Sequence, residues 1–130
     1  RYTRNMSSFR AAALAVLAAL VSAAQTITPE PAEYELRHGT PGRHTIPLRA
    51  DQFAAIEVRQ TSVAAFARVL DPDGKEVGGG GTPLPRMPYG VGIAAERAGD
   101  YVVEILAATP GASGRYSIRL LEITTRARAA

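Results

Sequence analysis

The chain has 130 residues, with 15 basic and 12 acidic side chains and no cysteine. The lack of cysteine excludes a disulfide framework, and the length allows one domain beyond a leader. The net charge of +3 comes from three arginines among the first ten residues, so the part from residue 25 onward has 12 basic and 12 acidic side chains. With that balance and no cluster of arginines, we expect no nucleic-acid partner, which would need a basic face, and binding at a membrane surface finds no support by the same count.

The N-terminal segment 1–24 has the pattern of a secretory signal peptide. Three arginines precede the apolar run AAALAVLAALV at 11–21, and small residues follow it up to Ala24. This order is typical of a cleaved leader, and the run is shorter than the roughly 20 residues that span a bilayer. We expect a helical signal peptide that starts at Met6 and directs export to the periplasm or the outside of the cell. No stable membrane anchor is expected after cleavage. The alternative interpretation of the apolar run is a buried N-terminal helix, because alanine and leucine are strong helix formers.

After an extended lead-in at 25–32, short β-type runs alternate with turn signals at about the 8–12-residue spacing of sandwiches and barrels. Short connections favour antiparallel pairing, and the length suits two packed sheets. The sequence therefore predicts an all-β, jelly-roll-like antiparallel β-sandwich of about eight strands at 33–123, followed at 124–130 by the start of a linker. The expected strands are 34–37, 44–48, 53–60, 63–70, 75–77, 89–95, 101–106 and 115–123.

Individual segments carry further expectations about burial. In the run 53–60, apolar residues at 54, 56 and 58 alternate with Ala55, Glu57 and Arg59. One face of that strand is therefore expected to be buried and the other to face solvent. The segment 78–90 has four glycines at its start and three prolines, and we expect a flexible loop that joins no central strand. Tyr101 and Tyr116 fall on inward-facing positions of their strands and are expected in the core.

Three pieces of the sequence carry a family resemblance. They are ADQF at 50–53, VLDPDGK at 69–75, and AGDYVVEI at 98–105 followed by GRYSIRL at 114–120. In this order they resemble the bacterial pre-peptidase C-terminal (PPC-type) β-sandwich, in the exported N-terminal form found ahead of tetratricopeptide repeats and a CHAT-type peptidase-like domain. The resemblance covers about 33–123. It implies a non-catalytic accessory module within a larger protein.

The resemblance also implies a candidate metal site, because some PPC-type domains bind calcium through acidic loop residues. Asp71 and Asp73 lie in the matching turn and are the candidate ligands. Calcium takes six to eight oxygen ligands, however, and the segment 78–90 contains no acid. Two carboxylates in a Pro-Asp-Gly turn are commonly explained by turn geometry. We therefore expect no cofactor, with calcium as the alternative.

Catalytic chemistry finds little support in the sequence. His38 and His44 are the only histidines, and we expect both to be solvated loop residues, since zinc needs three or four ligands. No G-x-S-x-G elbow is present, and no serine has an evident partner base. The glycines at 78–81 are not followed by the Gly-Lys-Ser/Thr of a phosphate-binding loop. We predict that the chain is not an enzyme and has no catalytic residues.

One surface contact is predicted, at Tyr89 beside Arg86, where an exposed aromatic ring could meet a partner. The predicted function is a non-catalytic accessory or interaction module of an exported protein, with an unidentified protein or carbohydrate as partner. A calcium- or carbohydrate-binding module of the same fold is the alternative.

Overall fold

The computed structural model describes residues 24–37, 40–82 and 86–126. The predicted signal peptide lies outside these residues, apart from Ala24. The described part is all β, and the predicted sandwich is confirmed. Its strands are β1 (Gln25–Thr26), β2 (Ala32–Leu36), β3 (Gly42–Leu48), β4 (Gln52–Gln60), β5 (Ala65–Leu70), β6 (Glu76–Gly80), β7 (Pro88–Ala94), β8 (Gly99–Ala107) and β9 (Gly114–Thr125).

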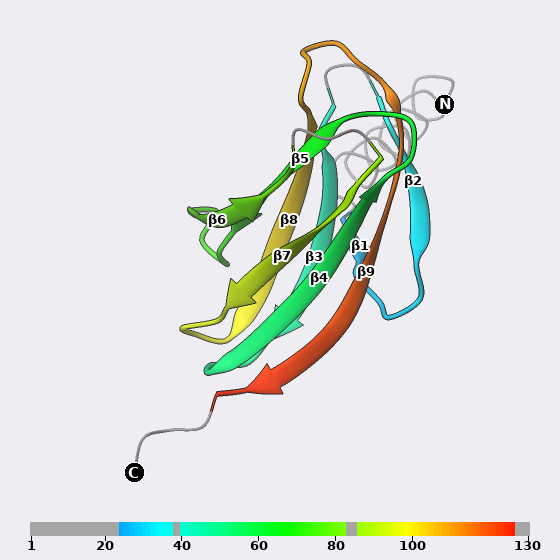
Figure 1. Cartoon of the computed structure of the whole chain (residues 1–130). Helices are drawn as coiled ribbons and strands as arrows, with labels where there is room; N and C mark the ends of the chain where they lie inside the picture. The colour runs from blue at the N-terminus through cyan, green and yellow to red at the C-terminus, as the bar shows by residue number, and fades with distance from the viewer. Residues whose placement is uncertain (1–23, 38–39, 83–85, 127–130) are drawn as a thin grey trace, which may run out of the picture.

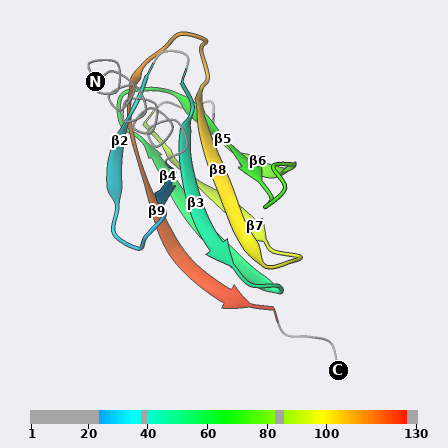
Figure 2. The same ribbon diagram turned by 180° about the vertical axis from the view of Figure 1, so that it is seen from behind.

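The strands form two sheets that face each other (Figures 1 and 2). The first sheet has the order β1-β3-β8-β5-β6 and the second has the order β2-β9-β4-β7. All neighbouring strands pair antiparallel except β1, which runs parallel to β3 with Gln25 opposite His44. The lead-in predicted at 25–32 thus contains a ninth, two-residue strand. None of the described residues belongs to a helix long and apolar enough to cross a membrane.

The core lies between the sheets and follows the two-residue period of the strands. Along β4, Ala54, Ile56 and Val58 are completely buried, as the alternation predicts. Tyr101 and Tyr116 are also in the core, which confirms their predicted inward positions. Apolar side chains from both sheets therefore form one cluster that holds the layers together.

The glycine run at 78–81 differs from the expected flexible loop, because its first three residues belong to β6. β6 is an edge strand that pairs with β5, and it passes close to the neighbouring sheet. A Cβ atom at Gly80 would lie 2.9 Å from the carbonyl oxygen of Gly90 in β7. Because Gly80 has no side chain, the edge strands β6 and β7 can approach each other closely. The two sheets therefore meet along this side of the sandwich.

A charged cluster crosses the outer face of the first sheet. Glu104 of β8 lies directly opposite Arg43 of β3 on one side and Arg68 of β5 on the other. Its carboxylate pairs with both guanidinium groups, including a 3.0 Å hydrogen bond from Arg68 Nε. Glu104 is only 5% exposed, so two arginines cover an acid that would otherwise face water.

Candidate functional site

Asp71 and Asp73 lie in the turn between β5 and β6. Asp71 Oδ1 accepts hydrogen bonds of 2.9 Å from the backbone N–H groups of Asp73 and Lys75. The Lys75 bond, together with the Asp73 N–H and the nearby Arg97 guanidinium, holds the pKa of Asp71 below its ordinary value. Gly74 has φ +86°, which the Asp-Gly step permits at low cost. Asp71 therefore organises the turn.

Arg97 joins this turn to the one between β7 and β8. Its guanidinium pairs with the Asp73 carboxylate and lies 3.9 Å from Asp71 Oδ2. The Arg97 carbonyl accepts a 2.8 Å hydrogen bond from the Tyr101 hydroxyl, which fixes the second turn to the core. Within the described ranges, no three acidic or histidine side chains lie close enough together to hold a metal ion.

The predicted contact at Tyr89 and Arg86 is corrected by the structure. Tyr89 is only 8% exposed, and its hydroxyl donates a 3.0 Å hydrogen bond to the Ala65 carbonyl. Burial raises the pKa of this hydroxyl. Arg86 is exposed, in a turn with φ 64°. Tyr89 points inward because it shares the parity of Val91 and Ile93 along β7, so the pair forms no common surface.

The expectation that His44 is solvated is also wrong; His38 lies outside the described residues. His44 is an inward-facing residue of β3, 2% exposed, and its Nε2 lies 2.6 Å from the Tyr116 hydroxyl oxygen. The Tyr34 ring packs on the imidazole at a centroid distance of 4.6 Å. Burial lowers the pKa of His44 to about 4, and its Nδ1 has no hydrogen-bond partner in the described part of the chain.

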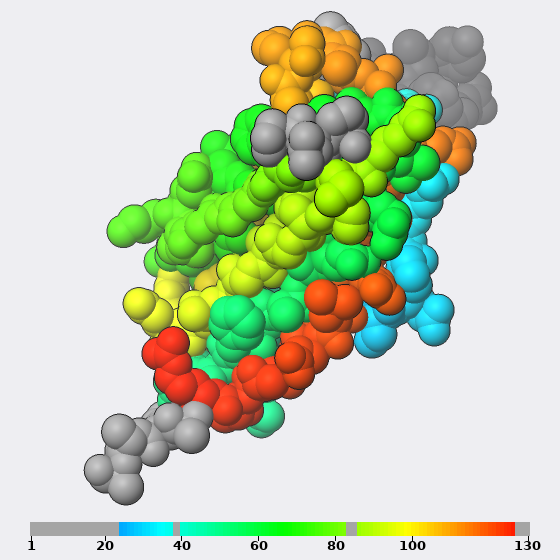
Figure 3. All heavy atoms as spheres, viewed as in Figure 1, coloured from blue at the N-terminus to red at the C-terminus, as the bar shows by residue number. Residues whose placement is uncertain are grey.

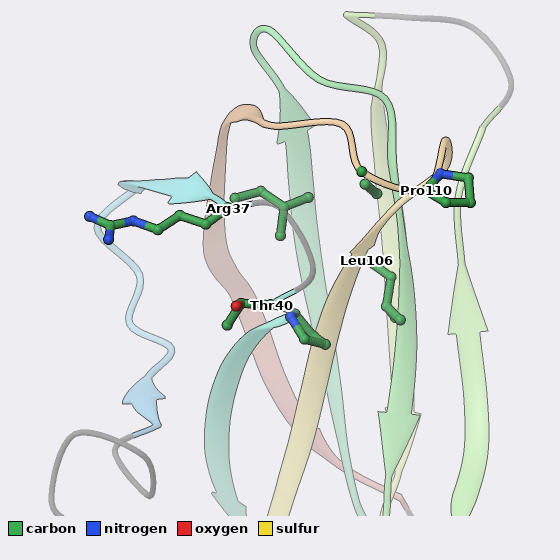
Figure 4. A pocket seen from close by; sticks show the side chains of 8 residues that line it. Arg37, Thr40, Leu106 and Pro110 are labelled. Carbon is green, nitrogen blue, oxygen red and sulfur yellow. The ribbon is translucent and has the colours of Figure 1, made fainter. Parts of the chain in front are cut away.

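One end of the sandwich carries an apolar pocket of about 300 Å³ between β2, β8 and the loop that follows β8. Leu36, Leu106 and Pro110 supply much of its lining (Figure 4). The side chain of Arg37 extends away from Leu106 and Pro110 in this view, and its Nε donates to Glu35. The pocket suits an apolar group, and none of its described lining residues points a charged side chain into it to orient a ligand.

At the opposite end, two hollows of about 610 and 140 Å³ share Phe53, Ala94 and Glu96, and we call them together the Phe53 groove. In Figure 3 it lies at the lower left, where the turn after β7 (yellow) comes between β6 (green) and the end of β9 (red). The larger hollow is lined by the shared residues and by Val69, Asp71, Lys75, Glu76, Val77, Gly92, Ile93, Arg97 and Tyr101; the smaller adds Asp51, Gln52, Ala95 and Arg126.

Phe53 was not predicted as a site residue, although the alternation along its strand indicates that its side chain faces outward. Ala54 is inward, so its neighbour Phe53 must point outward, and it is 40% exposed. The ring reaches over β7, where a Cβ atom at Gly92 would lie 2.9 Å from Phe53 Cζ. An aromatic ring thus lies beside charged side chains from two turns, a combination that can bind a partly apolar, partly polar ligand.

Two solved structures are similar to this chain. The pre-peptidase C-terminal domain of a collagenase from Bacillus anthracis aligns with a TM-score of 0.57 and 13% identity, over 75% of this chain and 94% of that domain. PliG of Aeromonas hydrophila, a periplasmic inhibitor of g-type lysozyme, aligns with a TM-score of 0.54 and 13% identity, over 78% of this chain and all of that one. No family model and no curated protein matches the chain.

Proposed function

Because the chain has the PPC-type β-sandwich fold, we propose that it is a non-catalytic accessory module of an exported protein and binds its partner through the Phe53 groove. The groove itself carries this proposal, since it combines an exposed aromatic ring, held in the paired strands β4 and β7, with charged side chains. Ligand sites commonly combine apolar contact surface with a few placed polar groups.

The position of His44 supports a non-catalytic role. A histidine that acts as a general base must lie within hydrogen-bond distance of a nucleophile or a substrate. The His44 imidazole is enclosed by Tyr34 and Tyr116, and its contact with the Tyr116 hydroxyl lies inside the core. This histidine therefore serves the packing of the sandwich.

The two similar solved structures support export within a larger protein. One similar structure is a domain of a collagenase, and the other is a periplasmic inhibitor. We propose that this module is likewise exported and that, as the sequence resemblance implies, it accompanies repeat or peptidase-like domains in the same polypeptide.

Export is tested by expressing the full chain in a Gram-negative host, fractionating the cells and sequencing the N-terminus of the recovered protein. A periplasmic product that begins at Gln25 is expected. A product retained in the cytoplasm with its leader intact would contradict export.

Binding is tested with that product on isolated cell envelopes, on immobilised collagen and on g-type lysozyme. At least one of these should retain the protein, and Phe53→Ala should abolish the retention. Phe66→Ala is the matched control, because Phe66 is 43% exposed but lies on the outer face of the other sheet. Equal retention of the Phe53→Ala variant, no retention on any material, or turnover of ester or peptide substrates would overturn the proposal.

A further inference from the structure

We infer that the Phe53 groove binds a neutral oligosaccharide chain; this deepens the proposed function and rests on it. The inference starts from the shape of the groove. Its larger hollow, of about 610 Å³, lies within the roughly 300–1,000 Å³ range of small-molecule sites. A smaller hollow shares Phe53, Ala94 and Glu96 with it. Two hollows that share the wall around one aromatic ring suit a chain of linked units better than a single compact molecule.

Phe53 supplies the apolar contact. The C–H face of a sugar ring is weakly positive and packs on the negative face of an aromatic ring. The exposed position of Phe53 beside Gly92 leaves this side chain accessible, and Gly92 has no side chain to cover it. Val77, which is 52% exposed, adds apolar surface to the wall of the larger hollow.

The charged groups of the groove favour a neutral ligand. The larger hollow has three acids (Asp71, Glu76 and Glu96) and two bases (Lys75 and Arg97) along its wall. An anionic ligand would meet the acids and a cationic ligand would meet the bases. Sugar hydroxyls, in contrast, both donate to carboxylates and accept from ammonium and guanidinium groups.

Two of these charged groups are available for such bonds. The side chains of Lys75 and Glu96 are exposed, and neither makes a hydrogen bond or ion pair to a side chain of the described residues. A hydroxyl-bearing ligand can therefore engage them without breaking an existing contact. This lowers the cost of binding.

The frame of the groove is already ordered. One wall is the Asp71 turn, held by its two side-chain to backbone hydrogen bonds. Another is the turn at Arg97, held by the Tyr101 hydroxyl and by the Asp73 pair. Phe53 and Gly92 lie in paired strands, with Phe53 opposite Ala94 in the β4–β7 register. A preformed site loses little conformational entropy on binding.

The test is calorimetric titration of the exported protein with neutral tetrasaccharides of β-1,4-linked glucose, β-1,4-linked N-acetylglucosamine and α-1,4-linked glucose. We expect at least one to bind, and Phe53→Ala to weaken it about tenfold or more. Phe53→Tyr should retain binding, and Phe66→Ala should match the parent protein. Because the ligand is neutral, raising the salt concentration to about 0.5 M should change the affinity less than about twofold.

The outcomes separate this inference from the proposed function. If none of the tetrasaccharides binds, or if Phe53→Ala binds as well as the parent protein, the oligosaccharide inference is wrong. If collagen or g-type lysozyme is instead retained in a Phe53-dependent manner, the groove is a protein-binding surface and the proposed function still holds. Melting temperatures of all variants, expected within about 2 °C of the parent for these exposed positions, show that lost binding is not lost folding.

Discussion

His44 Nε2 and the Tyr116 hydroxyl oxygen lie 2.6 Å apart in the middle of the core, where they join β3 of one sheet to β9 of the other. It is one of the polar contacts between two largely apolar layers, as is the hydrogen bond from the Tyr89 hydroxyl of β7 to the Ala65 carbonyl of β5. The contact of His44 with Tyr116 makes the sandwich sensitive to the protonation state of a single imidazole.

The first prediction concerns pH. Burial keeps His44 neutral in the folded protein down to about pH 4, whereas the unfolded chain binds a proton below about 6.5. The free energy of unfolding should therefore fall as the pH drops from 6.5 to about 4, by up to about 3 kcal/mol from this group. Urea unfolding of the parent and of His44→Phe across this interval checks it, because the variant should lose this part of the pH dependence. Identical slopes for both proteins would contradict it.

The second prediction concerns Gly42. A Cβ atom there would overlap the Tyr116 hydroxyl, so Gly42→Ala should lower the free energy of unfolding by about 1–3 kcal/mol. In a Tyr116→Phe background the same substitution should cost clearly less, because the overlapping atom is gone. A double-mutant cycle from chemical denaturation measures the coupling. Purely additive effects would show that the overlap is not the cause.

The third prediction concerns the glycine run of β6. Gly80→Ala should destabilise the fold by about 1–3 kcal/mol, since its Cβ would press on the Gly90 carbonyl. Gly78→Ala is the matched control, because its Cβ would meet only Val69 Cβ at 3.9 Å, an ordinary contact. The control should stay within about 0.5 kcal/mol of the parent. Thermal unfolding distinguishes the two, and equal effects would refute the close-approach explanation.

The fourth prediction concerns calcium. Asp71 already accepts two backbone N–H groups and Asp73 pairs with Arg97, so we expect the melting temperature to be the same in calcium and in a chelator. The measurement is a thermal unfolding scan of the exported protein in each buffer. A rise of several degrees in calcium, abolished by Asp71→Asn, would make these two acids metal ligands after all.

The fifth prediction concerns the buried carboxylate of Glu104. Glu104→Ala should lower the free energy of unfolding by about 2 kcal/mol, because Arg43 and Arg68 lose their charged hydrogen bonds to the acid and face each other without it. Glu76→Ala is the control: Glu76 is exposed, and its nearest contact with Arg68 is 3.8 Å. Its removal should change stability by less than about 0.5 kcal/mol. Denaturant titration of both variants tests the difference.

Local patterns were sufficient to predict the sandwich. The alternation along 53–60 correctly predicted an inward face at Ala54, Ile56 and Val58, because strand parity is a property of neighbouring residues. The turn at Asp71 follows from the fixed φ of Pro72 and the freedom of Gly74, and both are local. The inward positions of Tyr101 and Tyr116 followed from the same rule.

Errors arose where the partner lies far away in sequence. His44 looks like a solvated residue until Tyr116, 72 positions later, provides its partner. The glycine run was predicted to be flexible from its composition, because its neighbour Gly90 belongs to the other sheet and the local sequence does not show that contact. Only the folded structure shows that Gly80 allows β6 and β7 to approach closely. For Tyr89 the alternation along β7 predicts an inward side chain, but Gly90 and Gly92 between the apolar residues made this pattern weak. The Phe53 groove combines β4, β7 and two separate turns, so no single sequence window contains it.

The pairing of β9 has a mechanical consequence. β9 lies between β2 and β4, and its register with β4 runs from Gln52–Thr125 to Gln60–Tyr116. Antiparallel hydrogen bonds lie perpendicular to the strands, so a pull along the chain at Thr125 strains many of them at once. The module therefore resists such tension in shear, and it yields only when a whole strand slides past both of its neighbours.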